Sequence, residues 1–371
     1  MKILNVVGAR PNFVKMGPIM EALKSRPDSF EPILVHTGQH YDRALSDDFF
    51  RDLELPRPDI ELNVGSGSHA QQTGQVMMLF EETCLEVKPD LVLVVGDVNS
   101  TLACSIAAKK LGINVAHVEA GLRCGNRSMA EEINRLCTDS ISDYLFTPDP
   151  MAGENLLKEG IDKERIHFVG NVMIDSLFKY KEKADSLDYK SKLGLSNKEY
   201  GLVTLHRASN VDDASVLEGI LGALREISDE LPLILPIHPR TKKMVETYGL
   251  EKYLEYGDNV RGVWTAPPLG YLEFLHVMAG ARLVLTDSGG IQEETTALGV
   301  PCLTLRNDTE RPITCIQGTN SVVGTDSAVI VAAAKQVLGS SLAAKEPPEK
   351  WDGKTANRIV DVLSNSSTVA R

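Results

Sequence analysis

The stretch that most constrains the fold is residues 281–294, in which an apolar run leads into Asp287-Ser288-Gly289-Gly290 and then into a helix-forming run. This order predicts a strand, a tight turn and the start of a helix. Glycines let backbone N–H groups approach a ligand closely, and the first turn of a helix carries unpaired donors, so a phosphate group fits there. An Asp or Ser before a helix is also a common N-cap, and the stretch alone leaves both interpretations open.

The rest of the chain repeats this alternation of short apolar runs and helix-forming segments. The run at residues 90–95 is almost continuously apolar, which is typical of a strand buried on both faces of a parallel sheet. Residues 58–75 are the least decisive region and are interpreted as a loop, with a helix beginning near His69. The pattern therefore predicts an α/β fold, with strands near residues 2–7, 32–36, 90–95, 114–118, 144–146, 166–169, 200–205, 232–237, 259–265, 281–286 and 301–305.

The length of the chain and a charged stretch suggest two domains. A chain of 371 residues exceeds one comfortable hydrophobic core. The Lys-, Glu- and Asp-rich residues 180–199 are the best candidate for a boundary region. We expect an N-terminal domain at residues 1–172 and a C-terminal domain at residues 173–352, with a last helix near 353–366 as a candidate to pack back on the first domain.

Composition narrows the classes of function. The net charge of −12 argues against a general affinity for nucleic acid or for an anionic membrane. The six cysteines show no zinc-binding spacing, which is typical of reduced cytosolic thiols, and no metal-binding motif is found. No run approaches the roughly 20 apolar residues of a membrane span, so we expect a soluble cytoplasmic protein.

Acidic side chains follow neighbouring strands of the first predicted domain. Asp97 and Glu119 come directly after two consecutive strands, and a right-handed crossover would place these strand ends side by side. Glu131 begins a helix whose polar face is usually only solvated, but this helix follows the Glu119 loop closely enough to start at the same edge. Three acids near one edge cost repulsion and desolvation, which favours acid-base chemistry.

Cationic and histidine side chains follow other strand ends. Arg10 and Lys15 lie just beyond the first strand, where open α/β sheets bind ligands. A solvated surface pair is the alternative for them. His206 and His238 follow successive strands of the second half and are expected near the Asp287 turn, although a lone histidine is more often a capping or core residue.

Together these motifs resemble those of the non-hydrolysing UDP-N-acetylglucosamine 2-epimerases over nearly the whole chain. The resemblance implies two Rossmann-like domains of the glycosyltransferase-B type facing a cleft, and interconversion of UDP-GlcNAc and UDP-ManNAc without a redox cofactor or a metal. It also suggests a homodimer. The motifs that carry it are residues 8–11 with Lys15, 37–40, 96–97, 117–123, 131–135, 206–207, 238–239, 287–294 and 309–312.

The resemblance assigns roles to individual residues. It implies a catalytic set of Asp97, Glu119, Glu131 and His206. For the substrate it implies that Glu294 binds the ribose hydroxyls, that Phe274 and the backbone near Leu269 contact the uracil, and that Lys15 and Arg311 lie near the sugar and phosphates. The residues expected at the diphosphate are Arg10, His206, Ser288, Gly289 and Gly290.

The chain also departs from the family pattern. Met129-Ala130-Glu131 replaces the proline usually found before this glutamate. Residues 71–73 lack the arginine of members that bind a second UDP-GlcNAc as an activator, although the candidate allosteric residues Gln39 and His40 are present. Relatives with this pattern include epimerases that act on UDP-2,3-diacetamido-2,3-dideoxy-glucuronate, so two sugars stay open. A glycosyltransferase-B enzyme that transfers the sugar, a hydrolysing epimerase and a catalytically silent sensor are the rival functions.

Overall fold

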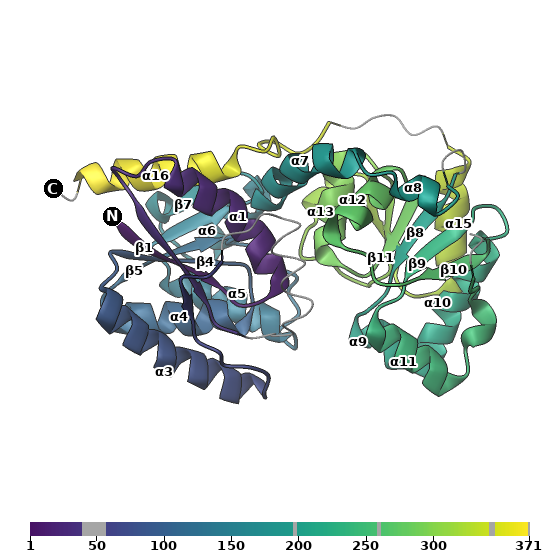
Figure 1. Cartoon of the computed structure of the whole chain (residues 1–371), viewed down its shortest axis with the longest axis horizontal. Helices are drawn as coiled ribbons and strands as arrows, with labels where there is room; N and C mark the ends of the chain where they lie inside the picture. Colours follow the sequence, from purple (N-terminus) through teal and green to yellow (C-terminus); the bar gives the residue numbers. More distant parts are fainter. Residues whose placement is uncertain (39–56, 196–198, 258–260, 341–345, 370–371) are drawn as a thin grey trace. The chain divides into compact units, whose positions relative to one another are not determined.

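The computed structural model describes residues 1–38, 57–195, 199–257, 261–340 and 346–369. The chain forms two compact units, one made of Met1–Phe178 with Glu349–Arg371 and the other of Lys179–Pro348 (Figure 1). Within the described part of the chain, no helix combines the length and the apolar character that crossing a membrane requires.

The first unit is built on a seven-stranded sheet in which every pair of neighbours is parallel. The central strand β4 is buried at all five positions, as its continuous apolar sequence predicts. The strands, in their order across the sheet, are β3 (Ile60–Glu61), β2 (Glu31–His36), β1 (Lys2–Val7), β4 (Leu91–Val95), β5 (Asn114–Val118), β6 (Tyr144–Thr147) and β7 (Ile166–Phe168).

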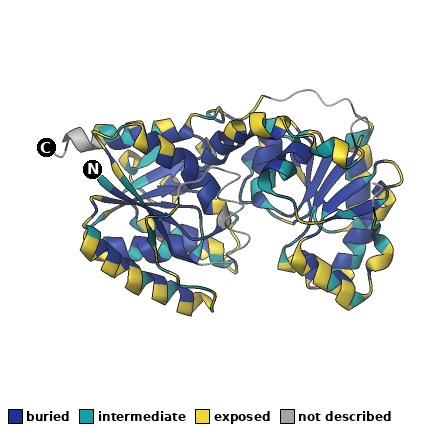
Figure 2. Cartoon of the chain, viewed as in Figure 1, coloured by how far each residue is buried: buried dark blue, intermediate teal, exposed yellow. Residues whose placement is uncertain are grey.

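Helices cover both faces of this sheet. Figure 1 shows α3 and α4 along one face and α1 with α16 along the other. The sheet and the inward sides of the helices are buried, while the outward sides are exposed (Figure 2). The helices that begin in this unit are α1 (Arg10–Lys24), α3 (His69–Val87), α4 (Asn99–Lys110), α5 (Ala130–Ile141), α6 (Pro150–Lys158), α7 (Val172–Asp185) and α16 (Thr355–Val369).

The second unit repeats the plan with a six-stranded parallel sheet. Its strands, in their order across the sheet, are β10 (Val263–Ala266), β9 (Leu233–Pro236), β8 (Gly201–Thr204), β11 (Leu283–Thr286), β12 (Cys302–Thr304) and β13 (Asn320–Val322). Its helices are α8 (Tyr189–Lys192), α9 (Ala208–Val211), α10 (Ala214–Ile227), α11 (Pro239–Tyr248), α12 (Tyr271–Ala279), α13 (Gly289–Leu298), α14 (Ile313–Ile316) and α15 (Ser327–Leu338).

The predicted α/β class with two Rossmann-like sheets is confirmed. The strand prediction was incomplete, because it missed two edge strands. β3 lies inside the region interpreted as a loop, and β13 was not predicted. Both are short, and β13 carries polar residues, so neither has a local apolar pattern. They form because the neighbouring strand supplies backbone partners, and the amide oxygen of Asn320 accepts a hydrogen bond from the Thr304 hydroxyl at 2.7 Å.

Candidate active site

A helix and two loops of the first unit converge at the side chain of Glu119, which follows β5. The ammonium group of Lys15, one turn into α1, contacts the Glu119 carboxylate directly, and the two side chains are only 10% and 3% exposed. Gly96, which follows β4, lies against this pair: a Cβ there would sit 3.5 Å from the Lys15 nitrogen and 3.6 Å from a Glu119 oxygen. The strand ends before Asp97 and Glu119 lie side by side, as predicted, whereas the contact between Lys15 and Glu119 was not predicted.

The backbone of Glu119 adopts the left-handed conformation, with φ of 73°. A non-glycine residue in this region costs on the order of 1–3 kcal/mol and persists only where its surroundings hold it. Here the backbone N–H groups of Glu119 and Ala120 both donate to the carbonyl oxygen of Phe146, each at 3.1 Å. Such conformations cluster at functional sites, which supports a chemical role for this carboxylate.

Asp97 is held by a cation of α5. Nη1 of Arg135 lies 2.5 Å from an Asp97 carboxylate oxygen, and the amide of Asn134 donates to the Asp97 backbone oxygen at 2.8 Å. The Asp97 side chain remains 32% exposed, so it is both positioned and accessible.

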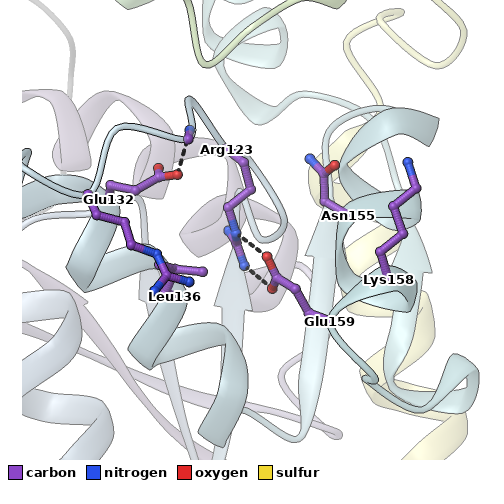
Figure 3. Close-up of a pocket in the computed structure, with 8 residues that line it drawn as sticks. Arg123, Glu132, Leu136, Asn155, Lys158 and Glu159 are labelled. Carbon is purple, nitrogen blue, oxygen red and sulfur yellow. Dashed lines mark hydrogen bonds and ion pairs between the residues drawn. The ribbon is translucent and has the colours of Figure 1, made fainter.

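The polar face of α5 is buried at Asn134, Arg135 and Thr138, and only its first residue, Glu131, is exposed. Arg135 also donates two hydrogen bonds to Glu132, at 2.9 and 2.6 Å. Figure 3 shows a further hydrogen bond to Glu132, donated by the backbone of Gly125 at 2.9 Å. Sequence reasoning missed Glu132, although its i, i+3 spacing to Arg135 was a usable signal. Glu131 is exposed in the first turn and makes no hydrogen bond or ion pair with another described residue.

In the second unit, Asp287 joins two strand ends instead of capping a helix. One carboxylate oxygen accepts the backbone N–H groups of His206 and Arg207, each at 2.9 Å, and the other lies 2.9 Å from Nδ1 of His206. Burial alone would raise the pKa of Asp287, but His206 and these donors hold it below its ordinary value. This contact fixes the His206 loop beside the start of α13.

The start of α13 has the features that an anion requires. Ser288 occupies the N-cap position, and its side chain makes no capping hydrogen bond to any described residue. The capping interpretation left open by the sequence therefore does not hold for Asp287 or Ser288. Gly290 faces open space, since a Cβ there would meet no atom within 4 Å, so a ligand can approach the backbone donors of the first turn.

Gly289 is required for a different reason, the packing of Arg311. A Cβ on Gly289 would lie 2.6 Å from Nη1 of Arg311 and 2.6 Å from a Glu310 oxygen. Arg311 is buried, with Nε 2.9 Å from Glu293 and Nη1 paired with Glu310. Sequence reasoning identified Arg311 but missed its two acidic partners.

Glu294 is buried in α13 and accepts a hydrogen bond from the Tyr271 hydroxyl at 3.0 Å. Burial, and then the charge of Glu293, raise the pKa of Glu294 to about 7. Phe274 in α12 and Leu269 in the preceding loop are half-buried. The Tyr271 partner was not predicted, because nothing in the local sequence pairs it with Glu294.

His206 and His238 approach each other, as the sequence predicts. Their ring centroids lie 5.8 Å apart, and the His206 side chain is 41% exposed. Burial and the neighbouring His206 lower the pKa of His238. Arg10 is the first residue of α1, and the candidate allosteric residues Gln39 and His40 lie outside the described residues.

Comparison with known proteins decides the family. The model of the UDP-N-acetylglucosamine 2-epimerase family matches residues 21–364. The chain belongs to this family. A UDP-N-acetylglucosamine 2-epimerase of Methanococcus maripaludis is 42% identical over 98% of this chain and 98% of the relative. The crystal structure of Methanocaldococcus jannaschii UDP-GlcNAc 2-epimerase in complex with UDP-GlcNAc and UDP superposes with a TM-score of 0.89, at 41% identity, covering 98% of this chain and 100% of that one.

A third relative of this epimerase family carries a different substrate name. The Pseudomonas aeruginosa UDP-2,3-diacetamido-2,3-dideoxy-D-glucuronate 2-epimerase is 41% identical over 98% of this chain and 99% of its own length. Membership in the family confirms the predicted resemblance and the predicted enzyme class, an isomerase. The names of the Methanococcus maripaludis and Pseudomonas aeruginosa relatives give different sugars, but both describe a 2-epimerase.

Proposed function

We propose that this chain interconverts UDP-GlcNAc and UDP-ManNAc by inverting C2 of the sugar. The observation that carries the proposal is the pair of carboxylates after adjacent parallel strands, Asp97 and Glu119, each bound to a buried cation. Inverting a carbon requires removing a proton from one face and returning one to the other. Two positioned acid-base groups are suited to that task.

The second unit is proposed to bind the nucleotide. The uncapped first turn of α13 and the open space at Gly290 support binding of the diphosphate. Glu294 would accept hydrogen bonds from the ribose, and Phe274 with the backbone near Leu269 would contact the uracil. The proposed diphosphate and sugar ligands are Arg10, Lys15, His206, Ser288, Gly289, Gly290 and Arg311.

The chemistry follows from the weak acidity of the C2–H bond, which is not adjacent to a carbonyl. The bond from C1 to the diphosphate therefore breaks first, its electron pair leaving with UDP, and the ring becomes an oxocarbenium ion. This charge acidifies C2, so a carboxylate can take the proton and leave a 2-acetamidoglucal. Protonation at the opposite face of C2 and return of UDP to C1 complete the inversion.

Groups of the protein would stabilise the charges that develop during these reaction steps. Donors at the α13 start and cationic side chains would stabilise the departing diphosphate, with His206 supporting it. Asp97, Glu119 and Glu131 would divide the two proton transfers. The buried cations Lys15 and Arg135 orient Glu119 and Asp97 before the reaction.

The proposal is tested by following UDP-GlcNAc in D2O by NMR. We expect deuterium at C2 of both epimers and exchange of the oxygen between C1 and the phosphate into non-bridging positions. Asp97→Asn, Glu119→Gln and Glu131→Gln should each reduce turnover by about 10²-fold or more, as loss of general acid-base catalysis does. Near-normal turnover in all three variants, or inversion without oxygen scrambling, would overturn it.

The diacetamido uronate is the second candidate substrate, favoured by the 41% identical Pseudomonas aeruginosa relative. Comparing kcat/KM for the two UDP-sugars under the same conditions decides between them. The NMR experiment in D2O also tests the glycosyltransferase alternative, which requires an acceptor for UDP release and gives no deuterium at C2. Free sugar and UDP as final products would instead indicate a hydrolysing enzyme.

We also infer that the protein is cytoplasmic and forms a homodimer, as the sequence predicts. The six cysteines, which all lie in the described part of the chain and form no disulfide, and the proposed use of a UDP-sugar support the first inference. Cell fractionation and sedimentation velocity test the two inferences, and a monomer at micromolar concentration would contradict the second.

A further inference from the structure

A buried histidine of β5 is hydrogen-bonded within the network that holds the turns of the two proposed catalytic carboxylates. His117, in β5, is fully buried, with Nδ1 2.6 Å from a carboxylate oxygen of Asp139 and Nε2 2.8 Å from the backbone oxygen of Gly96. Both partners are hydrogen-bond acceptors. Burial alone would raise the pKa of Asp139, but His117, Arg123 and the Gly121 N–H hold it below its ordinary value. Nε2 of His117 therefore donates to the Gly96 oxygen, and Nδ1 pairs with the Asp139 carboxylate.

The second oxygen of Asp139 binds the loop that carries Glu119. It accepts the backbone N–H of Gly121 at 3.0 Å and lies 2.7 Å from Nη2 of Arg123. Arg123 is itself fixed by a two-pronged pair with Glu159, at 2.8 and 2.7 Å (Figure 3). Asp139 thus joins α5 to the turn after β5.

The same two residues fix the turn that carries Asp97. Gly96 donates its N–H to the Val118 backbone oxygen at 3.1 Å and accepts the hydrogen bond from His117. Gly96 directly precedes Asp97, and Gly121 follows Glu119 by two residues. One hydrogen-bonded chain, Gly96–His117–Asp139–Gly121, therefore links the backbones on which both carboxylates are mounted.

This link acts beside a costly backbone conformation. Glu119 has φ of 73°, in the left-handed region, whereas Gly121, with φ of 82°, adopts this region readily because glycine has no Cβ. A Cβ on Gly121 would overlap the backbone oxygen of Ala152, so the turn also packs tightly against α6. A costly conformation persists only while several contacts over-determine it, and Asp139 supplies one of these contacts.

We propose that the His117–Asp139 pair positions Asp97 and Glu119 relative to each other for proton transfer at C2. The pair is not used elsewhere in the proposed mechanism, because neither side chain reaches solvent. The inference rests on the proposed function, in which the two carboxylates exchange protons with C2. Displacing a reacting group by about 1 Å can cost 10²-fold in rate, so proton transfer, not substrate binding, is the step that depends on the pair.

His117→Phe and Asp139→Ala test the proposal from its two ends. His117→Phe retains a ring but loses both hydrogen bonds, and Asp139→Ala frees the Gly121 turn. We expect kcat to fall by about 10- to 100-fold with KM changed less than about threefold. The isotope effect on turnover with C2-deuterated substrate should rise, because proton transfer becomes rate-limiting. A purely structural role would not change this isotope effect.

Asp139→Asn is the conservative variant. Its amide oxygen can accept from Gly121 while its NH2 group donates to a neutral His117, which keeps Nε2–H for Gly96. We therefore expect kcat within about threefold of wild type. A large loss of kcat in this variant, with normal folding, would show that charge matters instead of position and would overturn the proposal. Because Asn matches Asp in size and keeps its hydrogen bonds, we expect this variant to fold even if the other two do not.

Asp175→Asn is the matched control. Asp175 is also a buried carboxylate of the first unit, and it accepts the backbone N–H groups of Thr355 and Ala356 at 3.1 and 2.7 Å. Its variant should lose stability with kcat and the isotope effect unchanged. If the His117 and Asp139 variants behave like this control while the wild type exchanges deuterium at C2, the positioning role is wrong; absence of exchange in the wild type would instead refute the proposed function.

Discussion

The ionised form of Glu294 destabilises the folded state, so its effect on stability depends on pH. It is 4% exposed, and burial followed by the charge of Glu293 raises its pKa to about 7. The folded state therefore holds the proton more tightly than the unfolded state, whose pKa is the ordinary 4.5. The stability that protonated Glu294 provides is complete below pH 4.5 and is lost as the pH rises through about 7.

Replacing Glu294 with Gln should remove this cost. At pH 8 the free energy of unfolding should rise, by at most about 3 kcal/mol at ~1.4 kcal/mol per pKa unit, and at pH 5 it should rise far less. Urea denaturation at the two pH values measures the difference. If the carboxylate accepts the ribose hydroxyls, the same variant should bind UDP more weakly.

Glu81 is an exposed carboxylate on α3, and Glu81→Gln is the control for Glu294→Gln. It should change neither the free energy of unfolding nor UDP binding. An equal gain of stability for Glu294→Gln at both pH values would contradict the assignment.

The two glycines at the start of α13 have different roles, one in packing and one in leaving room for a ligand. Gly289 lies against the Arg311–Glu310 pair, whereas Gly290 faces open space. Adjacent glycines in one helical turn therefore serve different purposes. The sequence motif does not distinguish them, because both belong to the same Gly-Gly pair.

Alanine at each position should give opposite results. Gly289→Ala should lower the free energy of unfolding by about 1–3 kcal/mol, since its Cβ overlaps buried charged groups. Gly290→Ala should raise it by about 0.5–1 kcal/mol, because alanine favours a helix over glycine, but should weaken UDP binding by placing a methyl group where the diphosphate approaches. Thermal unfolding and calorimetric titration with UDP measure both effects. Unchanged UDP affinity in Gly290→Ala would rule out a diphosphate at this turn.

At the scale of the whole molecule, the end of the chain belongs to the first unit. Trp351 is 2% exposed and donates from its indole to the backbone oxygen of Pro148 at 3.1 Å. Helix α16 begins a few residues later, at Thr355, and Arg26 pairs with its Asp361 at 2.5 Å. The first unit is thus completed by residues from both ends of the sequence.

Trp351→Ala should destabilise the first unit by about 3–5 kcal/mol, the usual cost of deleting a buried aromatic side chain. The sequence contains two tryptophans, and the other, Trp264, lies in β10 of the second unit. Fluorescence of the variant therefore reports on the second unit, whose unfolding and UDP binding should be retained. Loss of the Trp264 transition together with the first unit would show that the units unfold as one.

Much of the architecture follows from local pattern. Most strands were predictable because each is an apolar run that ends in a turn, and strand ends in a parallel sheet meet at one edge. That rule correctly placed the strand ends before Asp97 and Glu119 side by side and grouped His206 with His238. It failed for β3 and β13, which are too short or too polar to carry a pattern of their own.

The sequence by itself determined the alternation of strands and helices, the residues at the strand ends and the family. Only the tertiary structure decided which charges pair, because the partners are distant in sequence: Lys15 and Glu119 are 104 residues apart, and Arg135 and Asp97 are 38 apart. It also decided that Asp287 binds the His206 loop instead of capping α13, and that Gly289 makes room for Arg311. Local periodicity records which face of an element is buried, whereas the partner of a buried charge depends on what the rest of the chain brings against it.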